Sequence, residues 1–179
     1  RLWAVDKNNN VGFFANDSFS ALVELNTTQA IVSVVADKAG QIWIATINEL
    51  FRFDSKLQML AELSAYGGVA ELHSMFIDHA NTLWLASAAG LVRFLGDRVS
   101  HYPLRTSVDP QTIWSIAEDK EGRFWFGTQT KLLLREHDET LVVVGPVNGI
   151  PAGAVRDLIV TSDGTLWAGV REFGLFQVD

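Results

Sequence analysis

The segment Ile113-Trp114-Ser115-Ile116-Ala117-Glu118-Asp119-Lys120-Glu121-Gly122-Arg123-Phe124-Trp125-Phe126-Gly127-Thr128 decides the fold of this chain. A short apolar run ends at Glu118-Asp119, and a second run, around Trp125, follows the turn at Gly122. Short apolar runs that end at turn residues are typical of strands buried on both faces, because a helix needs ten or more periodic residues. Gly122 tolerates the positive φ that a tight hairpin requires. The segment therefore predicts two adjacent antiparallel strands.

The same pattern recurs along the whole chain. Tryptophans at positions 3, 43, 84, 125 and 167 are separated by 40, 41, 41 and 42 residues. An apolar run precedes each of the last four of them, at 31–37, 72–78, 113–119 and 155–161. A third strand follows each tryptophan, as at 91–94, and a weaker fourth precedes the next copy. Four strands in about 41 residues form one blade, the repeating unit of a β-propeller.

The repeat predicts an all-β protein made of five β-propeller blades. The expected blades cover residues 1–25, 26–66, 67–107, 108–148 and 149–179. The chain starts on the second strand of one blade and ends on the third strand of another, so the two terminal blades are partial. Ring closure usually needs terminal strands that complete one shared blade. We therefore expect a segment of a larger propeller.

Composition excludes several kinds of site. Fourteen basic and 21 acidic residues give a net charge of −7, which argues against nucleic acid as a partner, because Lys and Arg supply most of that affinity. The chain has no cysteine and therefore no disulfide, thiolate metal ligand or cysteine nucleophile. No apolar run in the sequence approaches the length of a transmembrane helix.

The segment 113–128 resembles the two-component regulator propeller repeat, in which an apolar strand ending in Glu-Asp leads through a glycine turn into Leu-Trp-Val-Gly-Thr and then Gly-Leu. Gly90-Leu91 and Gly174-Leu175 supply the Gly-Leu element, whereas Glu49-Leu50 and Lys131-Leu132 depart from it. The resemblance implies a periplasmic sensor propeller of a bacterial signalling protein, with a histidine kinase, hybrid two-component or diguanylate cyclase output. Membrane attachment would come only through the parent protein.

One position of the repeat differs in residue type between the copies. Eleven residues before the aligned tryptophan, the copies carry Val32, His73, Trp114 and Arg156, whereas the preceding residue is always apolar. The loop entering the innermost strand opens on the face that usually binds ligands, so His73, Trp114 and Arg156 are predicted to surround a ligand mouth. An aromatic platform, a hydrogen-bonding group and a cation would suit an acidic sugar or another anion. That they are ordinary edge and packing residues remains the alternative.

The turns between the second and third strands should open on the same face. Their candidate ligand-binding residues are Glu49, Gln129, Lys131 and Arg171, accompanied by Asn48 and Glu172. In contrast, the aligned aspartates Asp37, Asp78 and Asp119 are expected to accept hydrogen bonds from turn amides, and the aligned tryptophans are expected to pack between blades.

No cofactor, metal site or catalytic residue is predicted. The four histidines, at 73, 79, 101 and 137, lack metal-ligand spacing, and no nucleophile or phosphate-loop motif is found. We expect a non-catalytic module for ligand sensing or signal relay, whose partners are a small molecule or saccharide, other blades of the parent propeller and a second copy in a dimer. The alternatives are a propeller enzyme, since the repeats also resemble those of streptogramin lyase, and a protein-interaction scaffold.

Overall fold

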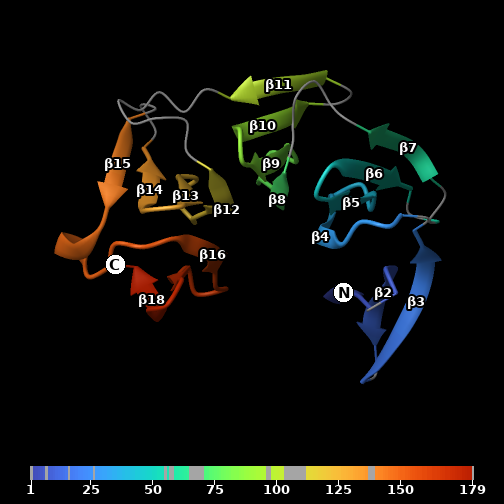
Figure 1. Ribbon diagram of the computed structural model, residues 1–179, viewed down its shortest axis with the longest axis horizontal. Coiled ribbons are helices and arrows are strands. Elements are labelled where there is room, and N and C mark those ends of the chain that lie inside the picture. Colours follow the sequence, from blue (N-terminus) through green and yellow to red (C-terminus); the bar gives the residue numbers. More distant parts are fainter. Residues whose placement is uncertain are drawn as a thin grey trace. The chain divides into compact units, whose positions relative to one another are not determined.

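The chain consists of consecutive antiparallel sheets, and the prediction of an all-β fold is confirmed. The computed structural model describes residues 2–6, 8–15, 17–25, 27–54, 56, 59–64, 71–95, 98–102, 112–136 and 140–178. These residues form five sheets, each built from strands that are consecutive in the chain (Figure 1). Hairpins connect most neighbouring strands, which is why a short repeat is enough to build a sheet. No helix among the described residues is long and apolar enough to cross a membrane.

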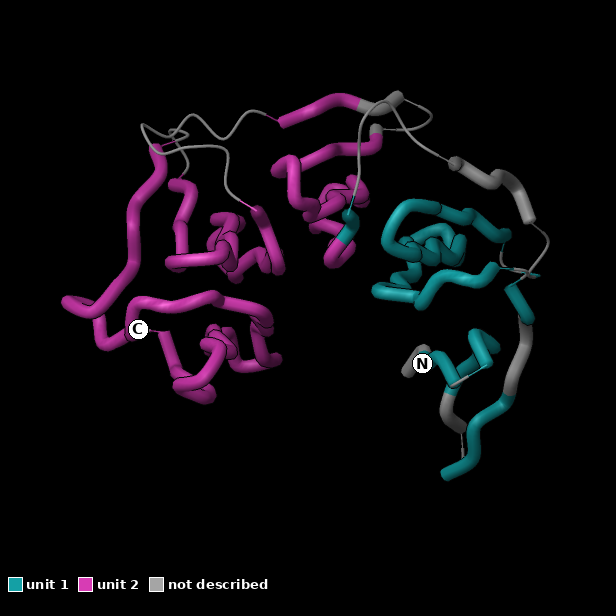
Figure 2. Tube along the Cα trace, in the orientation of Figure 1, with its two compact units in different colours: residues 1–72 teal, residues 73–179 magenta. Residues whose placement is uncertain are grey.

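Two compact units divide the chain, an N-terminal unit of residues 1–72 and a C-terminal unit of residues 73–179 (Figure 2). The N-terminal unit has a three-stranded and a four-stranded sheet. Their strands are β1 (Leu2–Val5), β2 (Asn10–Ala15) and β3 (Ser18–Glu24), then β4 (Ile31–Ala36), β5 (Ile42–Thr46), β6 (Glu49–Phe53) and β7 (Met59–Ser64).

The C-terminal unit has three sheets, of four, four and three strands. The first contains β8 (Leu72–Ile77), β9 (Leu83–Ser87), β10 (Gly90–Leu95) and β11 (Arg98–Tyr102). The second contains β12 (Ile113–Glu118), β13 (Phe124–Thr128), β14 (Leu132–Arg135) and β15 (Leu141–Val144). A 3-10 turn, η1 (Pro146–Asn148), leads to the third, formed by β16 (Val155–Val160), β17 (Leu166–Val170) and β18 (Gly174–Val178).

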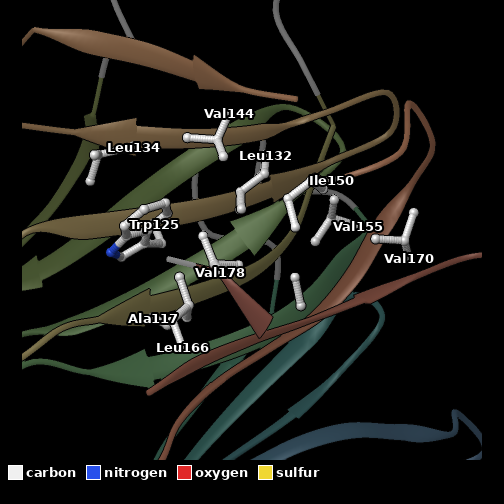
Figure 3. Packing of buried hydrophobic residues seen from close by; sticks show 11 residues of the cluster. Ala117, Trp125, Leu132, Leu134, Val144, Ile150, Val155, Leu166, Val170 and Val178 are labelled. Atoms are coloured by element: carbon white, nitrogen blue, oxygen red, sulfur yellow. The ribbon is translucent and has the colours of Figure 1, made fainter. Parts of the chain in front are cut away.

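The β12–β15 sheet lies between the other two sheets of the C-terminal unit. Alternate side chains of β13 point to opposite faces: Phe124 and Phe126 pack with residues of β8–β11, and Trp125 packs with residues of β16–β18. Figure 3 shows the second of these cores, which includes Trp125, Leu132, Val155 and Val178. Two-sided burial explains why all five residues of β13 are buried and why the repeat shows apolar runs instead of alternation.

Three of the aligned tryptophans and three of the aligned aspartates are structural, as predicted. Trp43, Trp84 and Trp125 are 5%, 5% and 6% exposed, whereas Trp167 in the β16–β18 sheet is only partly buried. The side chain of Trp3 lies outside the described part of the chain. Asp37, Asp78 and Asp119 each accept a hydrogen bond from the amide four residues later, at 2.8, 2.8 and 2.9 Å.

A further bond, which the sequence analysis did not anticipate, explains the fixed spacing of six residues between aspartate and tryptophan. The indole Nε1 of Trp84 donates to Asp78 and that of Trp125 donates to Asp119, both at 2.8 Å. Each carboxylate therefore ties its turn to the buried strand that follows it.

Gly127 allows the sheets around β13 to approach closely. A Cβ atom at this position would lie 2.5 Å from the backbone oxygen of Val155 on β16 and would also overlap the hydroxyl of Ser115 on β12. Any side chain would therefore push the backbones apart. Trp114, which precedes Ser115, and Arg156, which follows Val155, are two of the predicted ligand-binding residues.

Candidate functional site

Two of the predicted site residues are extra residues in β-bulges. In the pairing of β12 with β13, Ile113 lies opposite Thr128 and Ser115 lies opposite Gly127, which leaves Trp114 without a partner in the register. Arg156 occupies the same place between Val155 and Asp157 in the pairing of β16 with β17. A bulge re-aims the side chain of its extra residue out of the regular alternation. This explains why the position varies between copies while the residue that precedes it stays apolar.

The side chains of His73, Trp114 and Arg156 meet in one stack. The imidazole of His73 lies 3.8 Å from the indole of Trp114, centroid to centroid, with an angle of 23° between the planes. The guanidinium carbon of Arg156 lies 3.3 Å from the centroid of the Trp114 ring. The three residues come from the first strands of three successive sheets, β8, β12 and β16. We call this group the bulge stack.

Both faces of the Trp114 ring are covered. His73 belongs to the sheet that packs on one face of the β12–β15 sheet, and Arg156 belongs to the sheet that packs on the other face. The two stacking groups therefore reach the indole from opposite sides. The open aromatic platform expected from the sequence is not what the structure contains, because a neighbouring blade supplies a side chain to each face of the ring.

Two hydrogen bonds hold the stack in place. Nδ1 of His73 donates to the backbone oxygen of Ile113 at 2.9 Å; the carbonyl can only accept, so the proton sits on Nδ1. Nε1 of Trp114 donates to Oε1 of Gln129 at 2.9 Å. Gln129 is an exposed residue directly after β13. Its hydrogen bond to Trp114 joins a fourth predicted residue to the stack.

The charge of Arg156 is not neutralised by the described part of the chain. Its described interaction is the stacking on Trp114, with no carboxylate within ion-pair distance and no hydrogen-bond acceptor among the described residues. Arginine carries five N–H donors and remains charged at all accessible pH values. Arg156 is therefore a cation next to an aromatic ring, and the described residues accept none of its N–H donors.

The other predicted residues lie in different surroundings. Lys131 is two residues from Gln129 in the same turn, where its amide donates to Thr128 Oγ1 at 3.1 Å. Arg171 lies in the equivalent turn of the next sheet and faces Glu172 at 3.6 Å. Glu49 belongs to the N-terminal unit, where its carboxylate accepts a hydrogen bond from Thr27 Oγ1 at 2.8 Å. No hydrogen bond or ion pair within the described part of the C-terminal unit joins Lys131 or Arg171 to the bulge stack.

The other described histidines, His79 and His101, lie on different strands and turns. Nδ1 of His79 contacts Glu118, which also accepts the His79 amide at 2.8 Å and so links the β8–β11 and β12–β15 sheets. His101 lies in β11, and His137 is outside the described residues. Across the part of the chain that is described, no three His, Asp or Glu side chains lie together as metal ligands would.

Perturbed acidic groups lie in the turns after the first strands. Burial raises the pKa of Asp119, but hydrogen bonds from Trp125 and from the amide and guanidinium of Arg123 outweigh it and hold the pKa below its usual value. Hydrogen bonds from Thr161 and Thr165 lower the pKa of Asp163 to about 2. Both follow the end of a first strand, whereas the bulge stack lies near the start of these strands. They serve the scaffold.

Comparison with known proteins supports the assignment of the repeat. Residues 107–130 match the family described as the two component regulator propeller. The matched segment contains Trp114 of the bulge stack and Gln129, which is hydrogen-bonded to it. No curated protein sequence matches the chain.

Solved structures share the fold at low sequence identity. The extracellular domain of a hybrid two component system from B. thetaiotaomicron is 20% identical, with a TM-score of 0.77 over 100% of this chain and 27% of that domain. A second such domain from the same organism is 16% identical, with a TM-score of 0.71 over 99% of this chain and 24% of that chain. The virginiamycin B lyase of Staphylococcus aureus is 15% identical, with a TM-score of 0.65 over 85% of this chain and 56% of the lyase.

The chain thus corresponds to about a quarter of the length of these extracellular domains. Identities of 20% or less establish the fold and leave ligand and activity to be inferred from the chain's own residues. The repeat at 107–130, the consecutive antiparallel sheets and the shared fold identify a β-propeller chain that carries the two component regulator propeller repeat.

Proposed function

We propose that the chain is the ligand-recognition segment of a sensor propeller in a bacterial membrane-bound signalling protein. The repeat match at 107–130 and the likeness to two extracellular domains of hybrid two component systems support this assignment. The same likeness supports a location outside the cytoplasmic membrane. The segment acts without catalysis and passes its signal to a histidine kinase or a comparable output domain elsewhere in the parent protein.

The observation that carries the proposal is the bulge stack. Three successive first strands place His73, Trp114 and Arg156 in contact, although the scaffold requires none of these residue types at that position. Arg156, for which the described residues provide no hydrogen-bond acceptor, and the Trp114 ring held by Gln129 form a polar and aromatic cluster on the packed sheets. Binding clefts commonly combine such an apolar surface with a few convergent polar groups. Its ligand is a small molecule or saccharide.

Further blades of the parent propeller are the proposed protein partner. Leu175 on β18 is 65% exposed, whereas Leu132 and Leu91 at the equivalent register of the inner sheets are 0% and 2% exposed. Ile159 on β16 is also exposed. Another sheet packed on this surface of the β16–β18 sheet would bury the positions that neighbouring sheets bury elsewhere in the chain. A second copy of the chain is the alternative partner for the same surface.

Signalling follows from differential affinity. A ligand shifts the equilibrium between two states of the receptor only if it binds them unequally. The bulge stack connects three sheets through side chains of three strands, so a ligand that engages it depends on how these sheets are packed. Binding would therefore favour one packing arrangement and bias the membrane-coupled output.

A thermal-shift screen of the purified chain tests the proposal. Oligosaccharides, uronic acids, small anions and divalent cations are added, and a ligand at a hundred times its dissociation constant should stabilise the chain by roughly 2.7 kcal/mol. A shift that is reduced in Trp114→Phe and lost in Arg156→Ala supports binding at the bulge stack. The control is Lys120→Ala, which removes the same charge beyond the opposite end of β12.

Two outcomes would contradict the proposal. Ligand binding that survives both substitutions would place the site elsewhere. Stabilisation by divalent cations alone, together with metal-dependent turnover, would favour the propeller-enzyme alternative.

A further inference from the structure

We propose that the bulge stack is an oxyanion site, in which Arg156 binds a carboxylate or another oxyanion of the ligand and Trp114 serves as the surface that orients Arg156. This inference rests on the proposed function, because it names the chemical class that the sensor site accepts. It differs from sugar stacking on an aromatic ring, for which Trp114 would be the principal contact.

The first step is the coverage of the indole. A sugar ring stacks on an aromatic side chain only if one face of that side chain is open. His73 occupies one face of Trp114 at 3.8 Å and Arg156 occupies the other at 3.3 Å. A neutral saccharide would have to displace one of these groups to reach the ring. The edge of the stack, and not the face of the indole, is therefore available to a ligand.

The second step is the orientation of the guanidinium. At 3.3 Å from the ring centroid, a guanidinium avoids steric overlap only when its plane is nearly parallel to the indole. All five N–H bonds of a guanidinium lie in its plane and form a fork that matches two oxygens of a carboxylate, sulfate or phosphate. Stacking therefore directs the donors of Arg156 sideways, away from the ring.

The third step is the absence of a competing partner in the described chain. Arg123, which also lies over a tryptophan of this unit, is built into the scaffold, because it donates to Asp119 at 2.8 Å. Arg156 has no carboxylate partner among the described residues, and the quadrupole of the Trp114 ring attracts its charge to the face of the indole. Cation–π stacking holds the charge but satisfies none of the hydrogen-bond donors.

The fourth step concerns the groups around the indole. Gln129 accepts the Trp114 Nε1–H and His73 is held by the carbonyl of Ile113, so the rotation of the indole and of the imidazole is restrained. These are positioning residues, which fix the surface against which Arg156 lies. Arg156 is left as the residue that contacts the ligand.

The experiment compares matched probes on the same protein. Glucuronic acid carries a carboxylate that methyl glucoside lacks, and both are titrated into the chain at constant ionic strength while the Nε–H resonance of Arg156 is followed by NMR. Binding to Trp114→Phe, Arg156→Lys, Arg156→Ala and the control Lys120→Ala is measured by thermal shift, because two of these variants lack the Arg156 resonance, and near-UV circular dichroism verifies that each variant is folded.

The expected result is that glucuronic acid binds and shifts the Arg156 resonance, whereas methyl glucoside does not. Arg156→Ala abolishes binding, and Arg156→Lys weakens it at least about tenfold, because lysine keeps the charge but loses the planar fork. Trp114→Phe retains binding with reduced affinity, and Lys120→Ala leaves it unchanged.

Failure of this inference can be distinguished from failure of the proposed function. If methyl glucoside binds as tightly as glucuronic acid, and only Trp114→Phe weakens it, the site is a sensor site for neutral sugars and the oxyanion inference is wrong. Binding of glucuronic acid that Arg156→Ala leaves intact also overturns it. If neither probe nor sulfate perturbs the Arg156 resonance, the oxyanion site is refuted, and the wider thermal-shift screen decides whether a sensor site exists.

Discussion

Replacement of Gly127 by alanine should destabilise the C-terminal unit by about 2 kcal/mol. The added Cβ would lie 2.5 Å from the backbone oxygen of Val155, which cannot rotate away, and would overlap the hydroxyl of Ser115. Overpacking costs about 1–3 kcal/mol, and two overlapping atoms put this site at the upper end of that range; the loss of unfolded-state entropy on changing Gly to Ala returns about 0.4–1 kcal/mol, which leaves a net cost of about 2 kcal/mol. Since 1 kcal/mol corresponds to about 2–4 °C for a chain of this size, Tm should fall by roughly 4–8 °C.

Gly169 provides a matched control, because it occupies the equivalent position of the next sheet. A Cβ there would meet Cβ of Asp157 at 3.4 Å, which is an ordinary contact. Gly169→Ala should therefore leave Tm unchanged or raise it slightly through the unfolded state. Thermal unfolding of both variants, followed by near-UV circular dichroism and tryptophan fluorescence, measures the difference.

A double substitution tests the mechanism. Ser115→Ala removes one of the two overlapping atoms but leaves the carbonyl of Val155, so it should restore only part of the stability that Gly127→Ala removes. Ser115 directly follows Trp114 and Val155 directly precedes Arg156, the extra residues of the two bulges. Gly127→Ala should therefore also change the near-UV circular dichroism of Trp114 and weaken ligand binding. Equal effects of Gly127→Ala and Gly169→Ala would refute the argument that close backbone approach requires glycine at 127.

Three further predictions concern the scaffold and the stack. Trp84→Phe should destabilise the chain by about 1–3 kcal/mol in chemical denaturation, since the buried Asp78 loses its indole donor; an unchanged midpoint would show that this bond contributes nothing. Because the pKa of Asp119 is lowered in the folded state, its contribution to stability is complete above the unfolded value of about 3.9 and is lost as the pH falls through the folded value. Denaturation midpoints between pH 6 and pH 2 should therefore fall less steeply in Asp119→Asn than in the native chain, and parallel curves would contradict this. Gln129→Ala should change the near-UV circular dichroism of Trp114 and change the free energy of unfolding by no more than about 0.5 kcal/mol, because Gln129 is exposed. Loss of the folded signal would instead make Gln129 part of the scaffold.

Much of the fold could be predicted from the sequence because the determinants are local and repeated. Each first strand, its turn and the following strand lie within about 15 residues, and the repeated tryptophan shows that the same packing recurs in every copy. The resemblance of 113–128 to a propeller repeat agrees with the family match at 107–130. The bonds from Trp84 to Asp78 and from Trp125 to Asp119 were missed, although the constant spacing of six residues was visible in the sequence.

The candidate site was predicted only in part. The variable position singled out His73, Trp114 and Arg156, and three packed sheets bring these side chains together. Gln129 joins them, whereas Arg171 and Glu49 have their own partners in other turns. Equivalent positions in a repeat can be recognised by alignment, but whether turn residues reach a neighbouring side chain depends on contacts between strands that the repeat does not encode.

The amino-acid sequence was enough to predict the all-β architecture, the strand order within each repeat and the position at which the copies diverge, because these depend on apolar periodicity and turn chemistry within a few residues. The bulge at this position and the coverage of both faces of the Trp114 ring are seen only in the folded chain. The physical reason is that stacking joins side chains about 40 residues apart, and it arises only when separate sheets pack against one another.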